Sequence, residues 1–575
     1  MIVIDFEVFA YDWLCVMYDV NKDRWHIVHN DRDRLDRLFR AYRYSVFVGY
    51  NIRGYDQWIM KAILTGEDPK AVNDFIIEQG RNGASYSNKF ARIPLCFFDV
   101  QTTQDGLKKL EGFMGASIKE TSVPFDLPRP LNVHETDQVV AYCKYDVFAT
   151  FNVLKLRIAD YRSQLELCTE FNLGRSAMGI TKTQLAALVL NARKRNYNDE
   201  FSYDVPANVQ IQRYKHVLEW FRAHINGGPA IYHETLQTNV ASIPHVFAWG
   251  GVHGSLDNSH IKGPLVNCDV ASYYPSLMLE YGLMSRSIKD PSLYADIYHR
   301  RLEYKAAKDK RANAYKLVLN SVYGALKDVH NALYDPRQAN RVCVYGQLFL
   351  LDLIEHVENA GCAVPVNTNT DGVLFLLRED TSACRSALKA VCDEWQQRTR
   401  MVLEFDEYCE LWQKDVNNYI LIDSTGSYKS KGAFVKKLSP LDNDLPIVNR
   451  ALVEYMVHGV PIEQTVNGSQ DLMDFQQIFK VSNKYVAAQH NGRQFAETTF
   501  RVFASTRYTD GPLYKLKNKE GSLVPEKFAN CPDHCFIENG EVDGKPIPKV
   551  LDRAYYIELA KHRLDGFGGS NRGLF

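Results

Sequence analysis

The stretch NCDVASYYPS, residues 267–276, starts as a short apolar strand and breaks at a proline. It delivers Asp269 near the end of that strand and Tyr274 just before the proline. From residue 265 the order of apolar and turn-forming residues therefore predicts a strand, a turn and a helix. Because a carboxylate at a strand end can hold a metal ion, we expect a site to be built around this stretch.

A helix with a polar face is predicted downstream of this strand. Residues 294–327 predict two basic helices, separated near residues 308–311. In the second helix Lys316, Asn320 and Tyr323 fall four and then three positions apart, so they share one face. Taken alone, a basic run of this kind is typical of a solvated surface.

A second aspartate lies in a predicted hairpin turn. The sequence NTDG at 369–372 stands between the apolar runs 364–366 and 373–377. This pattern predicts two antiparallel strands whose turn presents Asp371. Mg²⁺ prefers one or two carboxylates together with substrate phosphates, so Asp269 and Asp371 would suffice to hold it.

The first part of the chain is predicted to contain alternating strands and helices. A strand starts at Ile2, a second is predicted at 44–50, and residues 32–43 between them fit an amphipathic helix. Asp5 and Glu7 are two positions apart at the end of the first strand. Both side chains therefore point to the same side of it.

Three more polar side chains can converge on that pair. Asp56 lies in the first turn of a helix after the second strand, where capping is the simpler explanation for this residue alone. Tyr142 and Asp146 are four positions apart on a helix predicted at 137–156, which places them on one face. Four converging carboxylates are what two divalent metal ions need for an in-line phosphoryl transfer.

In this order DFE, NxxxYD and YxxxD resemble the three motifs of DnaQ-like 3′→5′ proofreading exonucleases, over roughly residues 1–160. The resemblance implies a metal-binding set of Asp5, Glu7, Asp56 and Asp146. It also implies that Tyr142 lies beside the nucleophilic water and Asn51 near the primer strand. Lys119 stands where related bacteriophage polymerases place an accessory lysine.

The three later segments resemble motifs A, B and C of family B DNA polymerases. They are DxxSxYPS from Asp269, KxxxNSxYG from Lys316, and a variant of the DTDS turn at Asp371. The resemblance implies DNA synthesis with two Mg²⁺ ions per active site, with Mn²⁺ as a substitute. Asp269, Asp371 and the carbonyl oxygen of Val270 would hold them.

The same resemblance implies how a deoxynucleoside triphosphate is bound. Lys316, with Arg301 or Lys305, would neutralise the triphosphate, and Tyr274 would stack under the sugar and exclude a 2′-hydroxyl. The full set expected at the nucleotide is Ser272, Tyr274, Arg301, Lys305, Asn320 and Tyr323.

Several positions depart from the family's motifs. Asn369 stands where relatives usually have Asp and Gly372 where they have Ser, so the metal site carries one negative charge fewer. Trp249-Gly250-Gly251 matches the YxGG element only in part, and Asn417-Asn418-Tyr419 takes the place of Lys-x-Tyr. DNA contacts are still implied for Gly250, Gly251, Tyr419 and Lys431.

The expected fold class is α/β and α+β multidomain, with an RNase H-like exonuclease domain followed by a right-hand polymerase domain. Its expected parts are the exonuclease 1–165, a connecting region with the start of the palm 166–265, palm 266–292, short helical fingers 293–330, palm 331–440 and thumb 441–575. From about residue 440 short helices and polar loops are predicted, ending in a helix at 554–564.

Composition sets looser limits. The formal net charge of −1 neither supports nor excludes DNA as a partner, so phosphate-binding charge must be concentrated locally. Scattered cysteines and the lack of a signal peptide fit a cytoplasmic protein, in the host cytoplasm if the source is viral.

Cys531, His534 and Cys535 lack a second pair that would complete a zinc site. No apolar run approaches a membrane span, and we expect a monomer.

Spacing distinguishes the priming modes. Asp269 and Lys316 are 47 positions apart, and Lys316 and Asp371 are 55 apart. Protein-primed bacteriophage polymerases carry insertions in both intervals, so we expect a nucleic-acid-primed enzyme that works with primer–template DNA and with a helicase, primase, clamp or single-strand-binding protein. Two alternatives stay open: a protein-primed polymerase, and an exonuclease with a non-catalytic, polymerase-like DNA-binding region.

Overall fold

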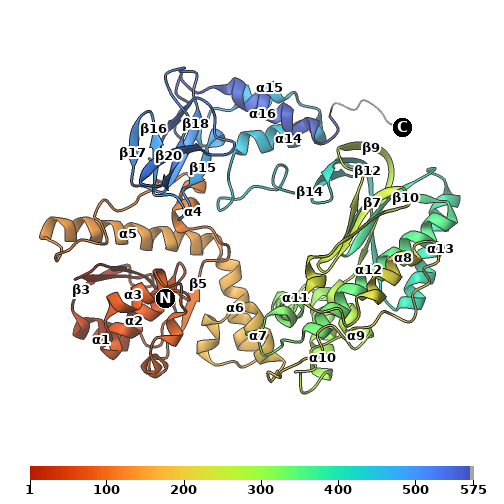
Figure 1. Ribbon diagram of the computed structural model, residues 1–575, viewed down its shortest axis with the longest axis horizontal. Coiled ribbons are helices and arrows are strands. Elements are labelled where there is room, and N and C mark those ends of the chain that lie inside the picture. Colours follow the sequence, from red (N-terminus) through yellow and green to blue (C-terminus); the bar gives the residue numbers. More distant parts are fainter. Residues whose placement is uncertain (570–575) are drawn as a thin grey trace. The chain divides into compact units, whose positions relative to one another are not determined.

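The structure is a computed structural model that describes residues 1–569. Figure 1 labels its elements, which group into two compact units, each built from several stretches of the chain. Unit 1 comprises residues 1–180, 438–447 and 468–556, and unit 2 comprises 181–437, 448–467 and 557–569. The segment 441–575, predicted as a single thumb, thus supplies residues to both units.

The first sheet of unit 1 has five strands in the order β3-β2-β1-β4-β5. Their bounds are β1 Ile2–Val8, β2 Trp13–Asp19, β3 Arg24–His29, β4 Phe47–Gly49 and β5 Phe97–Asp99. Strand β1 pairs antiparallel with β2 and parallel with β4. Ile4 and Phe6 of β1 are buried in the core. Because side chains alternate along a strand, Asp5 and Glu7 lie on the opposite face.

Six helices follow in this part of unit 1. They are α1 Arg32–Ala41, α2 Asp56–Thr65, α3 Pro69–Ile77, α4 Leu107–Phe113, α5 Val133–Leu156 and α6 Ile158–Glu170. The predicted strand from Ile2 and helix near 32–43 are confirmed, whereas the strand expected at 44–50 is only three residues long. Helix α5 starts before residue 137 because Asn132 and Glu135 form a capping box.

Residues 468–556 of unit 1, here named the C-terminal lobe, are rich in strands. They form a three-stranded sheet, β15-β18-β21, and a four-stranded sheet, β17-β16-β19-β20. The bounds are β15 Gln477–Lys480, β16 Ala487–His490, β17 Arg493–Phe495, β18 Thr499–Ala504, β19 Tyr514–Lys519, β20 Ser522–Lys527 and β21 Cys535–Ile537. The prediction of short helices and polar loops is therefore wrong for this lobe. Strands this short show too little alternation to be recognised.

Unit 2 is built around a nine-stranded sheet in the order β14-β13-β12-β9-β11-β10-β8-β7-β6. The bounds are β6 Leu236–Val240, β7 Ile243–Ala248, β8 Gly251–Ser255, β9 Ser259–Val270, β10 Ala363–Asn369, β11 Gly372–Leu377, β12 Leu403–Asp415, β13 Asn418–Ile422 and β14 Tyr428–Lys431. The predicted hairpin is confirmed as β10–β11. Strand β9 lies between β11 and β12.

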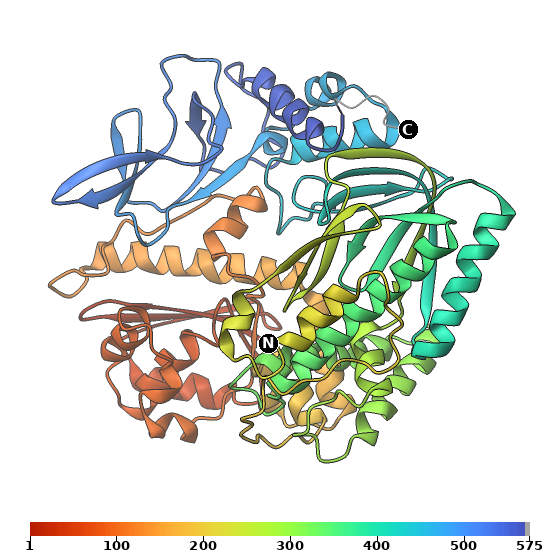
Figure 2. The same ribbon diagram turned by 45° about the vertical axis from the view of Figure 1, so that its right-hand side comes forward.

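Helices of the green part of the chain line one side of this sheet (Figure 2). The helices of unit 2 are α7 Lys182–Val189, α8 Lys215–Ala223, α9 Tyr273–Glu280, α10 Ser292–Ala306, α11 Arg311–Lys327, α12 Pro336–Ala360 and α13 Ser382–Thr399. Helices α14 Pro446–His458, α15 Ile462–Gly468 and α16 Arg553–Asp565 contribute residues to both units.

Two helix predictions of unit 2 and one near the end of the chain are confirmed. The basic pair expected at 294–327 is α10 and α11, and the helix expected at 554–564 is α16. The long buried helix α12 starts at Pro336 and packs against β8, β10 and β11. Among residues 1–569, no helix has the length and apolar character that crossing a membrane requires.

Candidate active sites

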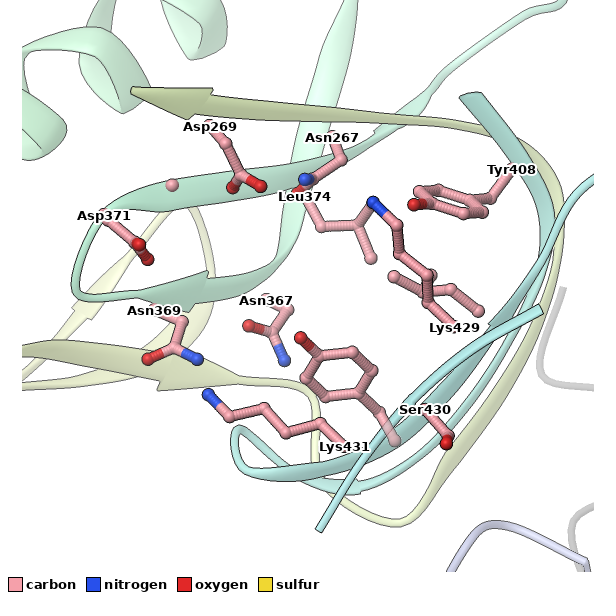
Figure 3. A pocket seen from close by; sticks show the side chains of 13 residues that line it. Asn267, Asp269, Asn367, Asn369, Asp371, Leu374, Tyr408, Lys429, Ser430 and Lys431 are labelled. Atoms are coloured by element: carbon pink, nitrogen blue, oxygen red, sulfur yellow. The ribbon is translucent and has the colours of Figure 1, made fainter. Parts of the chain in front are cut away.

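Asp269 and Asp371 lie side by side in unit 2 (Figure 3). Asp269 is the last residue but one of β9, and Asp371 stands in the β10–β11 turn. Gly372 is the direct partner of Asp269 across β11 and β9, and the Val270 N–H donates to the Asp371 carbonyl oxygen at 2.8 Å. Both aspartates line a cavity of about 420 Å³. The sheet register thus unites two carboxylates that are far apart in the sequence.

The electrostatics of this pair suit a bound cation. Burial raises the pKa of Asp269 and of Asp371, and the charge of Asp371 raises the pKa of Asp269 further. Lys429 and Lys431 on β14 act in the other direction: Lys429 lowers the pKa of Asp269 and Lys431 that of Asp371. Two neighbouring carboxylates that repel each other are a donor set that a divalent cation would stabilise.

Two tyrosines lie stacked where α9 meets α11. The rings of Tyr274 and Tyr323 are 4.1 Å apart between centroids and inclined by 13°. Ser272, in the left-handed region at φ +51°, comes directly before α9, and Arg301 Nη1 of α10 donates to its hydroxyl oxygen at 2.7 Å. The structure therefore joins four of the six residues predicted at the nucleotide into two contacting pairs.

The remaining predicted side chains of α10 and α11 are exposed. Lys316 and Asn320 face solvent on α11. Lys305 Nζ lies 3.7 Å from Glu404 Oε1 of β12, in an ion pair between two exposed side chains. The helix positions of Lys316, Asn320 and Tyr323 agree with the predicted spacing, but only Tyr323 is packed against another predicted residue.

Gly251 lies against the turn that carries Asp371, whereas Gly250 faces open space. Gly251 has φ +145°, and a Cβ built on it would lie 3.3 Å from Thr370 Oγ1. The Thr370 N–H donates to the Val252 carbonyl oxygen at 3.2 Å. The two remaining predicted DNA contacts, Tyr419 of β13 and Lys431 of β14, line the same cavity as the two aspartates.

The front carboxylates meet in unit 1. One ligand atom from each of Asp5, Glu7 and Cys143 lies within 4.8 Å of the others. Asp56 accepts a hydrogen bond from the Phe6 N–H at 3.2 Å, which ties the start of α2 to β1. Asp146 of α5 acts electrostatically on Asp5 and Glu7. All four predicted carboxylates are thus brought together from β1, α2 and α5.

This cluster carries more negative charge than its surroundings favour. Burial raises the pKa of Asp5 to about 7, and the charge of Asp146 contributes. Burial also raises the pKa of Glu7 and Asp56 well above the usual range, with Asp5 as the next cause for both. Oxygen-rich, mutually repelling carboxylates of this kind fit divalent metal ions.

The lysine at this site is Lys108 of α4. Its ammonium contacts the Asp146 carboxylate, lies 3.2 Å from Glu111 Oε1, and is 4.6 Å from the centre of the Tyr142 ring. Lys119 instead lies over the Tyr145 ring, at 4.5 Å. Sequence reasoning missed Lys108, although its place in LKKL between the second and third motifs was a usable signal.

A cavity of about 550 Å³ opens beside these carboxylates. Asp5, Glu7, Asp56 and the predicted Asn51 line it. Asn51 adopts φ +61°, and its N–H donates to Asp99 Oδ1 at 2.9 Å. Asp99 thereby fixes the turn after β4 and keeps Asn51 at the cavity. Cys143, which donates to Asp5 Oδ2 at 3.2 Å, is a neighbour that the sequence did not reveal.

No described protein family matches the chain, and neither does any curated protein. Among solved structures, the family B DNA polymerase from the hyperthermophilic archaeon Pyrobaculum calidifontis is similar over 100% of this chain and 78% of its own, with 14% identity and a TM-score of 0.41. That similarity is too low to support an activity. The function has to be inferred from the residues of the two sites.

Proposed function

We propose that the protein is a template-directed DNA polymerase that adds deoxynucleotides to a primer 3′-hydroxyl and proofreads with a 3′→5′ exonuclease. One observation carries the synthetic activity: Gly372 pairs with Asp269, which sets Asp371 beside it in one cavity. Two carboxylates from neighbouring strands, joined by substrate phosphates, are the donor set that Mg²⁺ prefers. The finer fold assignment, an RNase H-like domain followed by palm, fingers and thumb, belongs to this proposal.

Both acidic sites suit two Mg²⁺ ions, or Mn²⁺ in their place. Asp269, Asp371 and the Val270 carbonyl oxygen would hold the ions in unit 2. In unit 1 the ligands would be Asp5, Glu7, Asp56 and Asp146. When bound, the ions supply activation of the attacking oxygen and neutralise the charge that develops on the leaving oxygen.

The residues of unit 2 divide the remaining tasks of synthesis. Lys316, with Arg301 or Lys305, would neutralise the triphosphate as pyrophosphate leaves. Tyr274, held flat against Tyr323, would lie under the sugar and exclude a 2′-hydroxyl. The hydrogen bond from Arg301 to Ser272 supports this grouping, because it ties α10 to the residue directly before α9.

The residues of unit 1 would perform the exonuclease reaction. Tyr142, one helical turn before Asp146 on α5, would orient the attacking water. Lys108 would keep Asp146 ionised, because an ammonium in contact with a buried carboxylate favours its charged form. Asn51, at the wall of the neighbouring cavity, would contact the primer strand.

Single-site variants test the two activities separately. Asp371→Ala should reduce primer extension with all four deoxynucleotides at least about a hundredfold and leave 3′→5′ degradation unchanged. The double variant Asp5→Ala with Glu7→Ala should do the reverse. Glu407→Ala removes an exposed carboxylate and Asp36→Ala a half-buried one; both lie outside the two cavities and are matched controls.

The outcomes also separate the alternatives. Extension by Asp371→Ala at the wild-type rate would exclude this site as the centre of synthesis. An exonuclease with a non-catalytic DNA-binding region predicts that the wild-type protein degrades DNA and extends no primer.

A further inference from the structure

Arg501 is a fully buried arginine on β18 of the C-terminal lobe. A guanidinium has five N–H donors, and here each one is used. The acceptors are Gln476 Oε1 at 3.0 Å and the carbonyl oxygens of Glu538 at 3.3 Å, Gly540 at 2.5 Å, Gly112 at 3.0 Å and Ala116 at 2.7 Å. None of these five acceptors is a carboxylate. A buried charge held this way costs folding free energy, so it is unusual as a purely stabilising feature.

The two arms of the guanidinium bind different parts of unit 1. Nη1 donates within the C-terminal lobe, to Glu538 and Gly540. Nη2 donates to Gly112, in the last turn of α4, and to Ala116 just after it. Carbonyl groups at the C-terminal end of a helix lack partners within the helix and favour a positive charge. Arg501 therefore ties the end of α4 to the lobe.

Further contacts fix the same turn to the lobe. Gln476 Nε2 donates to the Phe113 carbonyl oxygen at 3.2 Å, and the Val542 N–H donates to that of Gly115 at 2.9 Å. In the other direction, the Ile118 N–H donates to the Asn539 carbonyl oxygen at 2.7 Å. Four carbonyl groups and one amide of residues 112–118 are thus hydrogen-bonded to the lobe.

Helix α4 carries the lysine of the exonuclease site. Lys108 is four residues before Gly112, so one helical turn separates its Cα from the carbonyl group that Arg501 holds. Lys108 contacts Asp146, and its Nζ also lies 3.2 Å from Oε1 of the fully buried Glu111 carboxylate. A shift of the helix end would move both groups relative to α5.

We propose that Arg501 is a positioning residue of the exonuclease: it fixes the C-terminal end of α4 and thereby sets Lys108 against Asp146. This inference rests on the proposed exonuclease function and gives the C-terminal lobe a part in proofreading. Among the described residues, α4 supplies none that line the cavity beside Asn51. Loss of Arg501 should therefore affect the chemical step and not the binding of the DNA end.

The main test is Arg501→Lys, which keeps the charge and loses the planar fork. With a single-stranded oligonucleotide, kcat for 3′→5′ degradation should fall by about 10- to 100-fold, the effect of a small misplacement of a reacting group. KM should stay within about twofold, because the cavity is unchanged. Primer extension by the same preparation should be unaffected.

Two further variants separate positioning from stability. Gln476→Met removes the Arg501 Nε acceptor and the Phe113 contact, and should lower kcat in the same direction but less. Val502→Ala, at the next residue of β18, opens a cavity in the core of the lobe and should lower the Tm while keeping kcat at temperatures below it. Unchanged kcat in folded Arg501→Lys, or a rise in KM in its place, would overturn the proposal.

Amide hydrogen exchange keeps the two proposals distinct. If the folded wild-type protein degrades no DNA, the exonuclease function itself is wrong. Hydrogen exchange does not depend on that activity. If Arg501 fixes α4, the amides of residues 108–118 should exchange at least about tenfold faster in Arg501→Lys than in wild type, and no faster in Val502→Ala than in wild type. Equal exchange in Arg501→Lys and wild type would show that Arg501 does not fix α4.

Discussion

Gly372 and Asp269 face each other so closely that a Cβ atom built on Gly372 would lie 1.9 Å from Asp269 Oδ1. The same Cβ would lie 3.0 Å from the carbonyl oxygen of Cys268. The φ angle of Gly372 is outside the left-handed region, so the turn conformation does not require glycine. Glycine is required here because a larger side chain would occupy the space of the Asp269 carboxylate. The close approach of Asp269 thus explains why this chain has Gly372 where the family motif has Ser.

Replacing Gly372 by Ala should therefore damage synthesis more than folding. The Asp269 side chain must rotate away from the new methyl group, which displaces a metal ligand. We expect the primer-extension rate to fall by about 10- to 100-fold, the usual effect of a small misplacement at a reacting centre. Single-strand degradation should be unchanged, and so should the Tm within a few degrees. Normal extension by Gly372→Ala would show that the carboxylate has another position available.

Asn369→Asp tests the second departure in the same turn. Asn369 lines the cavity of Asp269 and Asp371, and Lys431 is on its wall (Figure 3). A third carboxylate raises the negative charge of the site, and ligand charge tunes cation affinity. The Mg²⁺ concentration for half-maximal extension should fall by about fivefold. Asn369→Ala is the matched control and should not lower it.

Tyr274→Ala tests sugar selection. The ring that packs on Tyr323 at 4.1 Å would be lost, and space for a 2′-hydroxyl would open. The ratio of ribonucleotide to deoxynucleotide incorporation should rise by about 10- to 100-fold. Tyr274→Phe keeps the stacked ring and should keep the wild-type ratio. An equal rise in both variants would mean that the hydroxyl group, and not the ring, excludes the ribose.

The sequence predicted the acidic residues better than their surroundings. Asp269, Asp371 and the front carboxylates stand in short motifs, each within a single strand, turn or helix, so the local sequence could single them out. That the members of each group would meet was expected from the resemblance to known motifs. Lys119 was the lysine named from the sequence and Lys108 was missed, because the place of Lys108 depends on how α4 is held by the C-terminal lobe.

The C-terminal lobe itself could not be predicted for a related reason. Its strand β18 pairs with β15 and β21, which are separate segments of the chain, and such pairing leaves no local pattern. Strand β2 was missed because nearly all of its residues are buried, so the apolar–polar alternation of a half-buried strand is absent.

Removing the carboxylates of unit 1 should raise the Tm of the metal-free protein and reduce the stabilisation that Mg²⁺ provides. Glu7 and Asp56 are buried beside Asp5, and these like charges destabilise the metal-free fold. Asp5→Asn with Glu7→Gln should therefore raise the Tm in the presence of a chelator, by an amount equivalent to about 1 kcal/mol. The same variant should show a smaller Tm rise on adding Mg²⁺, because ligand binding to the folded state is lost. A thermal melt with and without chelator checks both signs.

The last prediction concerns priming and duplex DNA. Between Asp269 and Lys316 the chain forms α9, α10 and the start of α11. Between Lys316 and Asp371 it forms the rest of α11, α12 and β10. Only short connections, 271–272, 281–291, 307–310, 328–335, 361–362 and 370, lie outside these elements. We therefore expect extension of an oligonucleotide primer on single-stranded template, and arrest where the template becomes duplex.

A singly primed circle measures this directly. The wild-type protein should copy the circle once and stop at the 5′ end of the primer, and adding a helicase should restore further synthesis. We expect this arrest because helices and strands of unit 2 take up nearly all of the chain between Asp269 and Lys316 and between Lys316 and Asp371. Neither stretch has room for an inserted domain that could separate the two strands of duplex DNA. Asp371→Ala is the control for synthesis by a contaminant. Rolling-circle products without accessory proteins, or transfer of a nucleotide to a protein hydroxyl, would contradict the nucleic-acid-primed assignment and favour the protein-primed alternative.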